Sequence, residues 1–243
     1  MATKAQSWYS SWFNTPYYHL LYKDRDCSEA QEFMRHLTTF LQLGKGASIL
    51  DLACGKGRHS IYLNELGYRV VGADLSQNNI VHAKPFENEN LHFKLHDMCE
   101  PIGEKFDAVF NLFTSFGYFE NPEDNLRTIK AIKQDITPAG FGVIDFMNAD
   151  LVIKNLVPSE TKSVHGIDFR ITRWLENGVI FKEINFTDEG KEFSFIEKVK
   201  ALKVRDFQEY LDRAGMTLLH VFGDYHLRKF TVATSPRTIL IFR

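Results

Sequence analysis

The chain has 243 residues, of which 44% are hydrophobic and 25% are charged, and its formal charge is −2 at pH 7. This composition suits one globular domain with a small appended module. Lysine and arginine form no cluster, so the sequence gives no support for binding nucleic acid or an anionic membrane through charge. No apolar stretch is long enough to cross a bilayer and residues 1–11 lack the apolar core of a signal peptide, so a cytoplasmic protein is expected.

The three cysteines are Cys27, Cys54 and Cys99, an odd number without Cys-x-x-Cys spacing. Neither a disulfide framework nor a structural zinc site is indicated, and no metal is expected. Cys54 is interpreted as a small apolar filler, because nothing in the sequence favours a reactive thiolate there.

The first part of the chain holds an aromatic segment at 8–22 and a predicted helix at 28–43, between an N-cap at Ser28 and a stop at Gly44. From Ala47 onward predicted strands and helices alternate, which indicates a parallel sheet with right-handed crossovers. The strands are expected at 49–52, 69–74, 91–95, 106–112 and 141–147, and the helices at 58–67, from about 76, and at 121–134.

The pattern changes after Asp150. Hairpin turns are predicted at 177–178 and 188–190, so three or four antiparallel strands are expected between 162 and 200. A helix at 204–214 and two last strands at 217–223 and 238–242 follow. Because an insertion at the carboxyl edge of a parallel sheet lies over the ligand crevice, this segment is a candidate cover for the active site.

A glycine-rich turn follows the first buried strand, in the run Ile-Leu-Asp-Leu-Ala-Cys-Gly-Lys-Gly at 49–57. Gly55 and Gly57 remove side chains that would keep a ligand from the backbone, and the free amides of the next helix favour a carboxylate or phosphate. The turn lacks the Gly-Lys-Ser/Thr ending of a mononucleotide loop, and Ser60 stands where a dinucleotide loop has its third glycine. Binding of a nucleotide phosphate by this turn is therefore the weaker interpretation.

Asp74 closes the second strand, about twenty residues beyond the glycines, where a carboxylate can accept both ribose hydroxyls of an adenosine. The alternative is that Asp74 only caps the helix that starts near Ser76.

The pattern Asp-x-Ala-x-Gly-x-Gly at 51–57 resembles motif I of the class I S-adenosylmethionine-dependent methyltransferases, with Ala53 in place of the first glycine. The resemblance is strongest over 47–148 and includes the last two strands. It implies an α/β fold, a Rossmann-like doubly wound sheet of seven mostly parallel strands, with an antiparallel β insertion after strand five. It also implies three parts: an arm and helix acting as a lid at 1–45, a core at 46–149 and 201–243, and the insertion at 150–200 over the active site.

More specifically, the aromatic opening at 12–26, Gly57-Arg58-His59 and the run at 115–119 are similar to segments of one bacterial group of small-molecule methyltransferases. In that group the opening segment folds over the cofactor, and an acid and its neighbour after strand three hold the adenine. The resemblance therefore implies S-adenosylmethionine contacts, with S-adenosylhomocysteine as product, from Tyr17, Tyr18, Tyr22, Arg25, Asp51, Ala53, Cys54, Gly55, Gly57, Arg58, Asp74, Leu75, Asp97, Met98 and Asn111. Alternatively, the tyrosines only pack the arm, Arg58 is solvated, and Asp97 and Met98 are turn residues.

Methyl transfer to a small-molecule acceptor needs mainly an aligned nucleophile and the removal of water. Asn111 and Ser115 are candidates to meet the acceptor. His165 and His226 are candidate bases, although a lone histidine is more often a surface or packing residue. An NAD(P)-dependent oxidoreductase and a non-catalytic S-adenosylmethionine-binding protein remain alternatives.

Methylation of nucleic acid or protein arginine is disfavoured. The residues 111–114 lack the Asn-Pro-Pro-aromatic pattern of base methyltransferases, and the loop lacks the paired glutamates that would bind a guanidinium. A monomer or homodimer is expected.

Overall fold

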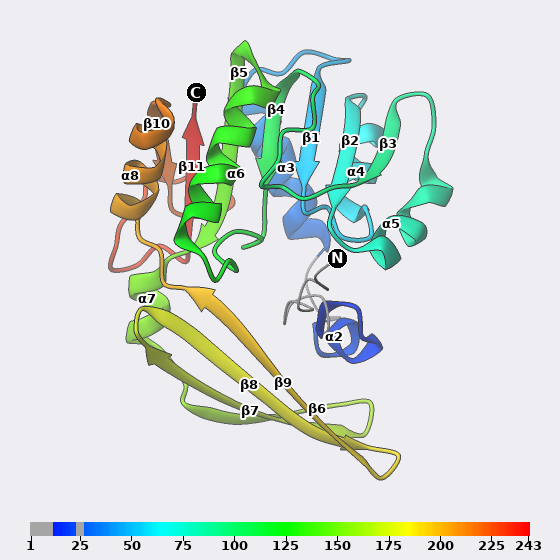
Figure 1. Cartoon of the computed structure of the whole chain (residues 1–243), viewed down its shortest axis with the longest axis vertical. Coiled ribbons are helices and arrows are strands. Elements are labelled where there is room, and N and C mark those ends of the chain that lie inside the picture. Colours follow the sequence, from blue (N-terminus) through cyan, green and yellow to red (C-terminus); the bar gives the residue numbers. More distant parts are fainter. Residues whose placement is uncertain (1–11, 23–26) are drawn as a thin grey trace, which may run out of the picture. The chain divides into compact units, whose positions relative to one another are not determined.

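The computed structural model describes residues 12–22 and 27–243. The chain divides into two compact units, seen in Figure 1. The sheet unit contains the described residues of 26–151 and 202–243, and the antiparallel unit contains those of 1–25 and 152–201.

The sheet unit is built on seven strands in the order β10-β11-β5-β4-β1-β2-β3. Neighbours among β1 to β5 pair in parallel, whereas β11 pairs antiparallel with both β5 and β10. The chain moves outward from β1 to β3 and then returns to β4 beside β1, which creates the switch in strand order where such sheets bind ligands. The strands are β1 Ser48–Leu52, β2 Arg69–Asp74, β3 Leu91–Leu95, β4 Phe106–Asn111, β5 Ile136–Met147, β10 Leu218–Phe222 and β11 Arg237–Phe242.

Helices cover both faces of this sheet. One face holds α3, α4 and α5, whose buried residues share a core cluster with the strands, while α6 and α8 pack together on the other face (Figure 1). The helices are α3 Cys27–Phe40, α4 Arg58–Glu65, α5 Gln77–Ala83, η1 Lys84–Phe86, α6 Pro122–Asp135, α7 Ala149–Lys154 and α8 Val204–Ala214. The predicted doubly wound fold is confirmed. Within 12–22 and 27–243, no helix has the length and apolarity that crossing a bilayer requires.

The helix α3 belongs to the sheet unit, although the sequence-based division placed it with the amino-terminal arm. The reason is its apolar stripe: Phe33, Met34 and Leu37 are fully buried in the same cluster as Ile49 of β1. A stripe of this kind needs a sheet face to cover it.

The strand β5 begins at Ile136, earlier than the predicted start at 141, and residues 138–140 lie inside it. Its pairing with β4 shifts there, from Phe106 opposite Ile136 to Ala108 opposite Phe141. Extra residues on one strand form a bulge, and Gly140 fits because a Cβ would lie 2.8 Å from the Phe106 carbonyl oxygen.

The antiparallel unit is a four-stranded sheet in the order β6-β7-β8-β9. Its strands are β6 Ser159–Val164, β7 Ile167–Glu176, β8 Val179–Asp188 and β9 Lys191–Lys200. Both predicted hairpin turns are confirmed, and each has two consecutive left-handed residues: Asn177 and Gly178 with φ of 49° and 73°, and Glu189 and Gly190 with φ of 47° and 75°.

The aromatic opening segment packs on this antiparallel sheet. It forms α2 Pro16–Leu21, whose amino end is capped by the Thr15 side chain. Fully buried Trp12 and Leu21 share a cluster with Phe169 and Phe186 of the sheet. The described residues of this segment therefore pack on the sheet. Packing was one of the two interpretations of its tyrosines.

Candidate active site

The turn after β1 contains three left-handed residues within five positions. Ala53, Gly55 and Gly57 have φ of 61°, 58° and 81°. Glycine adopts this conformation without strain, whereas alanine costs about 1–2 kcal/mol there. Ala53 therefore carries strain that the usual glycine would avoid.

The two glycines of the turn serve different purposes. A Cβ on Gly57 would lie 2.5 Å from the Phe93 ring, so this glycine lets the start of α4 pack against β3. A Cβ on Gly55 would meet no atom within 4 Å. Gly55 therefore leaves open space beside its backbone, as a ligand-binding turn requires.

Asp51 lies beneath this turn and is almost fully buried. Burial raises its pKa to about 7; a hydrogen bond from Ser60 lowers it, and the nearby charge of Asp74 raises it. The Ser60 hydroxyl donates to Asp51 Oδ2 at 2.6 Å. Ser60, which replaces the third glycine of a dinucleotide loop, thus ties α4 to β1.

Asp74 joins the glycine turn to α5. Its Oδ2 accepts from the Gly55 amide at 2.8 Å, and its Oδ1 accepts from the Ser76 amide at 2.8 Å and from Asn79 Nδ2 at 3.2 Å. The cap of α5 is Ser76 itself, whose hydroxyl accepts from the Asn79 amide. A carboxylate offers about four acceptor positions, so these three bonds leave Asp74 one position for a ligand hydroxyl, and a second becomes free if the Asn79 side chain, at 3.2 Å, turns away.

The residues after β3 and β4 meet at the side chain of Asn111. This asparagine is fully buried, and its Nδ2 donates to the Leu52 carbonyl at 3.2 Å and lies 3.7 Å from Met98 Sδ. Its Oδ1 is buried and has no hydrogen-bond partner among the described residues. Asp97 forms a turn in which its Oδ1 accepts from the Cys99 amide at 3.0 Å.

The loop after β4 is held by a buried charged pair that the sequence analysis missed. Phe113 and Thr114 are both left-handed, with φ of 58° and 61°. Asp145 of β5 is fully buried; its Oδ2 accepts from the Phe113 amide at 2.8 Å and its Oδ1 from Arg237 Nε at 2.8 Å. Arg237 also donates to Thr114 Oγ1 at 2.8 Å, and the Tyr225 hydroxyl donates to Asp145 Oδ2 at 3.4 Å.

A signal for this pair was present in the sequence, since an acid inside the apolar run 141–147 needs a partner when buried. The interaction with Asp145 helps to raise the pKa of the Arg237 guanidinium against the opposing effect of burial, so this side chain stays charged.

The other predicted residues are distributed as follows. Leu75, beside Asp74, is 50% exposed, and Arg58 is exposed at the start of α4. The Ser115 hydroxyl donates to the Leu112 carbonyl at 2.9 Å. Cys54 is buried, and burial raises the pKa of its thiol, which agrees with a filler.

The remaining candidates lie in the loop before β11 or in the other unit. His226 is in the β10–β11 loop of the sheet unit, beside Glu32 of α3. His165 is in the exposed β6–β7 turn of the antiparallel unit. There the Tyr17 hydroxyl donates to Asp188 at 2.8 Å and that of Tyr22 to Glu197 at 2.7 Å, while Tyr18 packs edge-on against Trp12. Arg25 lies outside the described residues.

Comparisons with known proteins agree with this geometry. Residues 49–140 match the family model described as a methyltransferase domain. The chain is 24% identical over 197 residues to the dTDP-3-amino-3,4,6-trideoxy-alpha-D-glucopyranose N,N-dimethyltransferase of Streptomyces venezuelae, covering 74% of this chain and 79% of that one. It is 32% identical over 138 residues to the glycine/sarcosine N-methyltransferase of Aphanothece halophytica, covering 53% and 49%.

A solved structure, an S-adenosylmethionine-dependent methyltransferase from Clostridium acetobutylicum ATCC 824, has the same fold: the TM-score is 0.78 at 21% identity, covering 93% of this chain and 95% of that one. The match to a methyltransferase domain favours this class over a nicotinamide-dependent oxidoreductase. Residues 49–140 thus match a methyltransferase domain, and the comparisons support an S-adenosylmethionine-dependent methyltransferase with S-adenosylmethionine as the methyl donor.

Proposed function

We propose that this enzyme methylates an amine nitrogen of a small molecule, and that an amino sugar is the first class of acceptor to test. The similarity to an amino-sugar N,N-dimethyltransferase over 74% of the chain supports this choice. The observation that supports binding of the methyl donor is the open backbone at Gly55 beside the Asp74 carboxylate, at the point where the strand order reverses. The choice of an amine rests on the similarity.

For the donor, we assign the ribose hydroxyls to Asp74, because it is a carboxylate with acceptor capacity left at a strand end. Leu75 and Met98 would contact the adenine with apolar surface, and Asp97 would accept from its exocyclic amine. The methionine part would lie along the amides of 53–57, with Arg58 near its carboxylate. The Oδ1 of Asn111, which has no partner among the described residues, is an acceptor that a ligand can satisfy.

When bound, S-adenosylmethionine supplies an electrophilic methyl group on a sulfonium. The chain then has two tasks: to align the acceptor and to exclude water. An amine attacks through its own lone pair, so we assign no general base to His165 or His226. Asn111 and Ser115 remain the residues that we propose to face the acceptor.

We also propose that the antiparallel unit covers the acceptor. The chain leaves the sheet unit shortly after the carboxyl end of β5 and returns before α8, which makes this unit an insertion at the ligand edge of the sheet. Its aromatic side chains, including Tyr17, Tyr18 and Tyr22, would supply the surface for a cationic or sugar-like ligand.

The test is transfer of labelled methyl groups from S-adenosylmethionine to two matched acceptors, a dTDP-amino sugar and the same nucleotide sugar with a hydroxyl in place of the amine. The proposal expects one or two methyl groups on the amine and none on the hydroxyl compound. Transfer to the hydroxyl compound alone would overturn the assignment to nitrogen. A metabolite extract that yields only labelled non-amine products would overturn it as well.

A further inference from the structure

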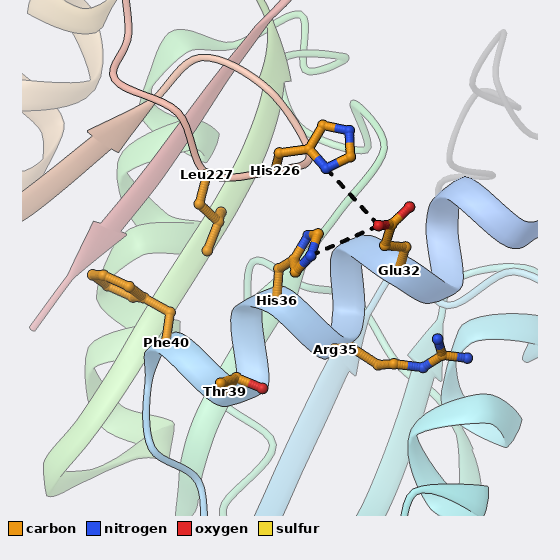
Figure 2. A pocket seen from close by; sticks show the side chains of 7 residues that line it. All are labelled: Glu32, Arg35, His36, Thr39, Phe40, His226 and Leu227. Atoms are coloured by element: carbon orange, nitrogen blue, oxygen red, sulfur yellow. Dashed lines mark ion pairs between the residues drawn. The ribbon is translucent and has the colours of Figure 1, made fainter.

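A group of side chains of metal-binding type lies between α3 and the β10–β11 loop of the sheet unit, beside Tyr225, whose hydroxyl reaches Asp145. Glu32 and His36 are one turn apart on α3 and therefore lie on the same face of that helix. His226 reaches them from the loop. One potential ligand atom of each residue lies within 4.8 Å of those of the other two. Figure 2 shows both imidazole rings turned toward the Glu32 carboxylate.

The potential ligand atoms lie slightly farther apart than they would around a bound ion. His36 Nε2 lies 3.8 Å and His226 Nδ1 4.0 Å from Glu32 Oε1, which is too far for hydrogen bonds. Ligands about 2.0–2.2 Å from a tetrahedral zinc ion are about 3.3–3.6 Å from one another. The three side chains are at least one-third exposed, so small rotations bring them to that spacing.

The orientation of His36 is already that of a metal ligand. Its Nδ1 lies 2.9 Å from the carbonyl oxygen of Tyr225, which can only accept, so the Nδ1 carries the proton. In the neutral ring this leaves the lone pair on Nε2, the atom that faces Glu32. Histidines that bind metals are commonly fixed in this way by a carbonyl on the other nitrogen.

The charge around the cluster permits a cation. The nearby cation in the same pocket is Arg35, whose Nε donates to the Tyr62 hydroxyl and whose guanidinium lies 5.5 Å from the centre of the Tyr62 ring. Figure 2 shows Arg35 pointing away from the two histidines. Glu32 is thus the charged side chain that faces His36 and His226.

We infer that Glu32, His36 and His226 form a binding site for a divalent transition-metal ion, with zinc as the first candidate. Two imidazoles and one carboxylate suit zinc, cobalt or nickel, whereas magnesium and calcium prefer oxygen ligands alone. Three protein ligands leave a further coordination position for water. This site is independent of the proposed amine acceptor.

The ion would tie the β10–β11 loop to α3 and so steady Tyr225. The ring of Tyr225 packs 4.5 Å from that of Phe33 on α3, and its hydroxyl reaches Asp145, which holds the loop after β4. The ion would therefore act on the loop after β4 through Tyr225 and Asp145.

The experiment uses the full chain without a histidine tag, stripped of metal, in calorimetry with ZnCl₂ and visible absorption with CoCl₂. The variants are Glu32→Gln and His226→Ala, and the matched control is His82→Ala, which removes an exposed histidine on α5. The wild type and the control should bind one equivalent. Each ligand variant should bind at least about tenfold more weakly, the lower end of what even indirect disturbance of a metal site causes.

A melting experiment separates binding from a folding defect. Without metal, His226→Ala should melt as the wild type does, and ZnCl₂ should raise the melting temperature of the wild type and of His82→Ala only. MgCl₂ should raise none of them. The site is overturned if the wild type shows no saturable zinc binding, or if both ligand variants bind zinc with unchanged stoichiometry and affinity.

Discussion

Replacing Asp74 by alanine should weaken cofactor binding far more than it weakens the fold. Two hydrogen bonds from ribose hydroxyls to a carboxylate contribute about 1.5–3 kcal/mol each. Because Asp74 is half-buried and not fully buried, we take the lower end, a loss of about 3 kcal/mol, which corresponds to about a hundredfold in the dissociation constant. The variant also loses the acceptor of the Gly55 and Ser76 amides, so unfolding should cost about 1–3 kcal/mol less.

The matched control is Asp107→Ala. Asp107 is a half-buried strand carboxylate as well, and its Oδ2 accepts from the amide and the hydroxyl of Ser48 at 2.8 and 2.9 Å. It stands near the start of β4, at the opposite edge of the sheet from Asp74. Calorimetry with S-adenosylhomocysteine should show normal affinity for Asp107→Ala, at a similar loss of stability in urea. Equal affinities for the two variants would refute the role of Asp74.

Three further predictions test the site. Gly55→Ala should weaken S-adenosylhomocysteine binding in calorimetry and cost only about 1–2 kcal/mol, from its left-handed conformation, because open space surrounds its Cβ position. Gly57→Ala should cost about 1–3 kcal/mol more than that in urea, because its Cβ would also crowd an aromatic ring; the opposite pattern would contradict their roles. Burial raises the Asp51 pKa from 3.8 to about 7, so the folded chain holds an extra proton between those values and its unfolding free energy falls as the pH rises through that window. Asp51→Asn should remove this fall in the free energy of unfolding, which urea unfolding curves at about pH 5 and about pH 8 measure. The same fall in the variant as in the wild type would contradict the raised pKa of Asp51. Arg237→Met should cost about 3–5 kcal/mol by leaving the buried Asp145 charge unpaired, and adding Asp145→Asn should recover part of this; a cost below about 1 kcal/mol would contradict the buried pair.

The sequence was most informative where function depends on local chemistry. The apolar run before Asp51, the glycines that follow it and the acid at 74 lie within one strand, turn and strand, so spacing alone predicts that they share an edge. The hairpin turn at Asn177-Gly178 was predictable for the same reason, since these two residues adopt left-handed conformations readily.

Contacts between distant segments could not be predicted. Asp145 and Arg237 meet because β5 and β11 pair antiparallel, and that register is not encoded in either segment alone. The start of β5 was missed because its bulge contains proline and glycine, residues that ordinarily end strands. The cluster of Glu32, His36 and His226 has no spacing signature, since His226 is far along the chain from the other two.

A crystal structure of the full chain with S-adenosylhomocysteine tests the central claim most directly. The account predicts the adenosine at the carboxyl ends of β1, β2 and β3, with both ribose hydroxyls on the Asp74 carboxylate and the amino-acid tail beside Gly55. A ligand bound elsewhere, or a ribose that makes no contact with Asp74, would contradict it.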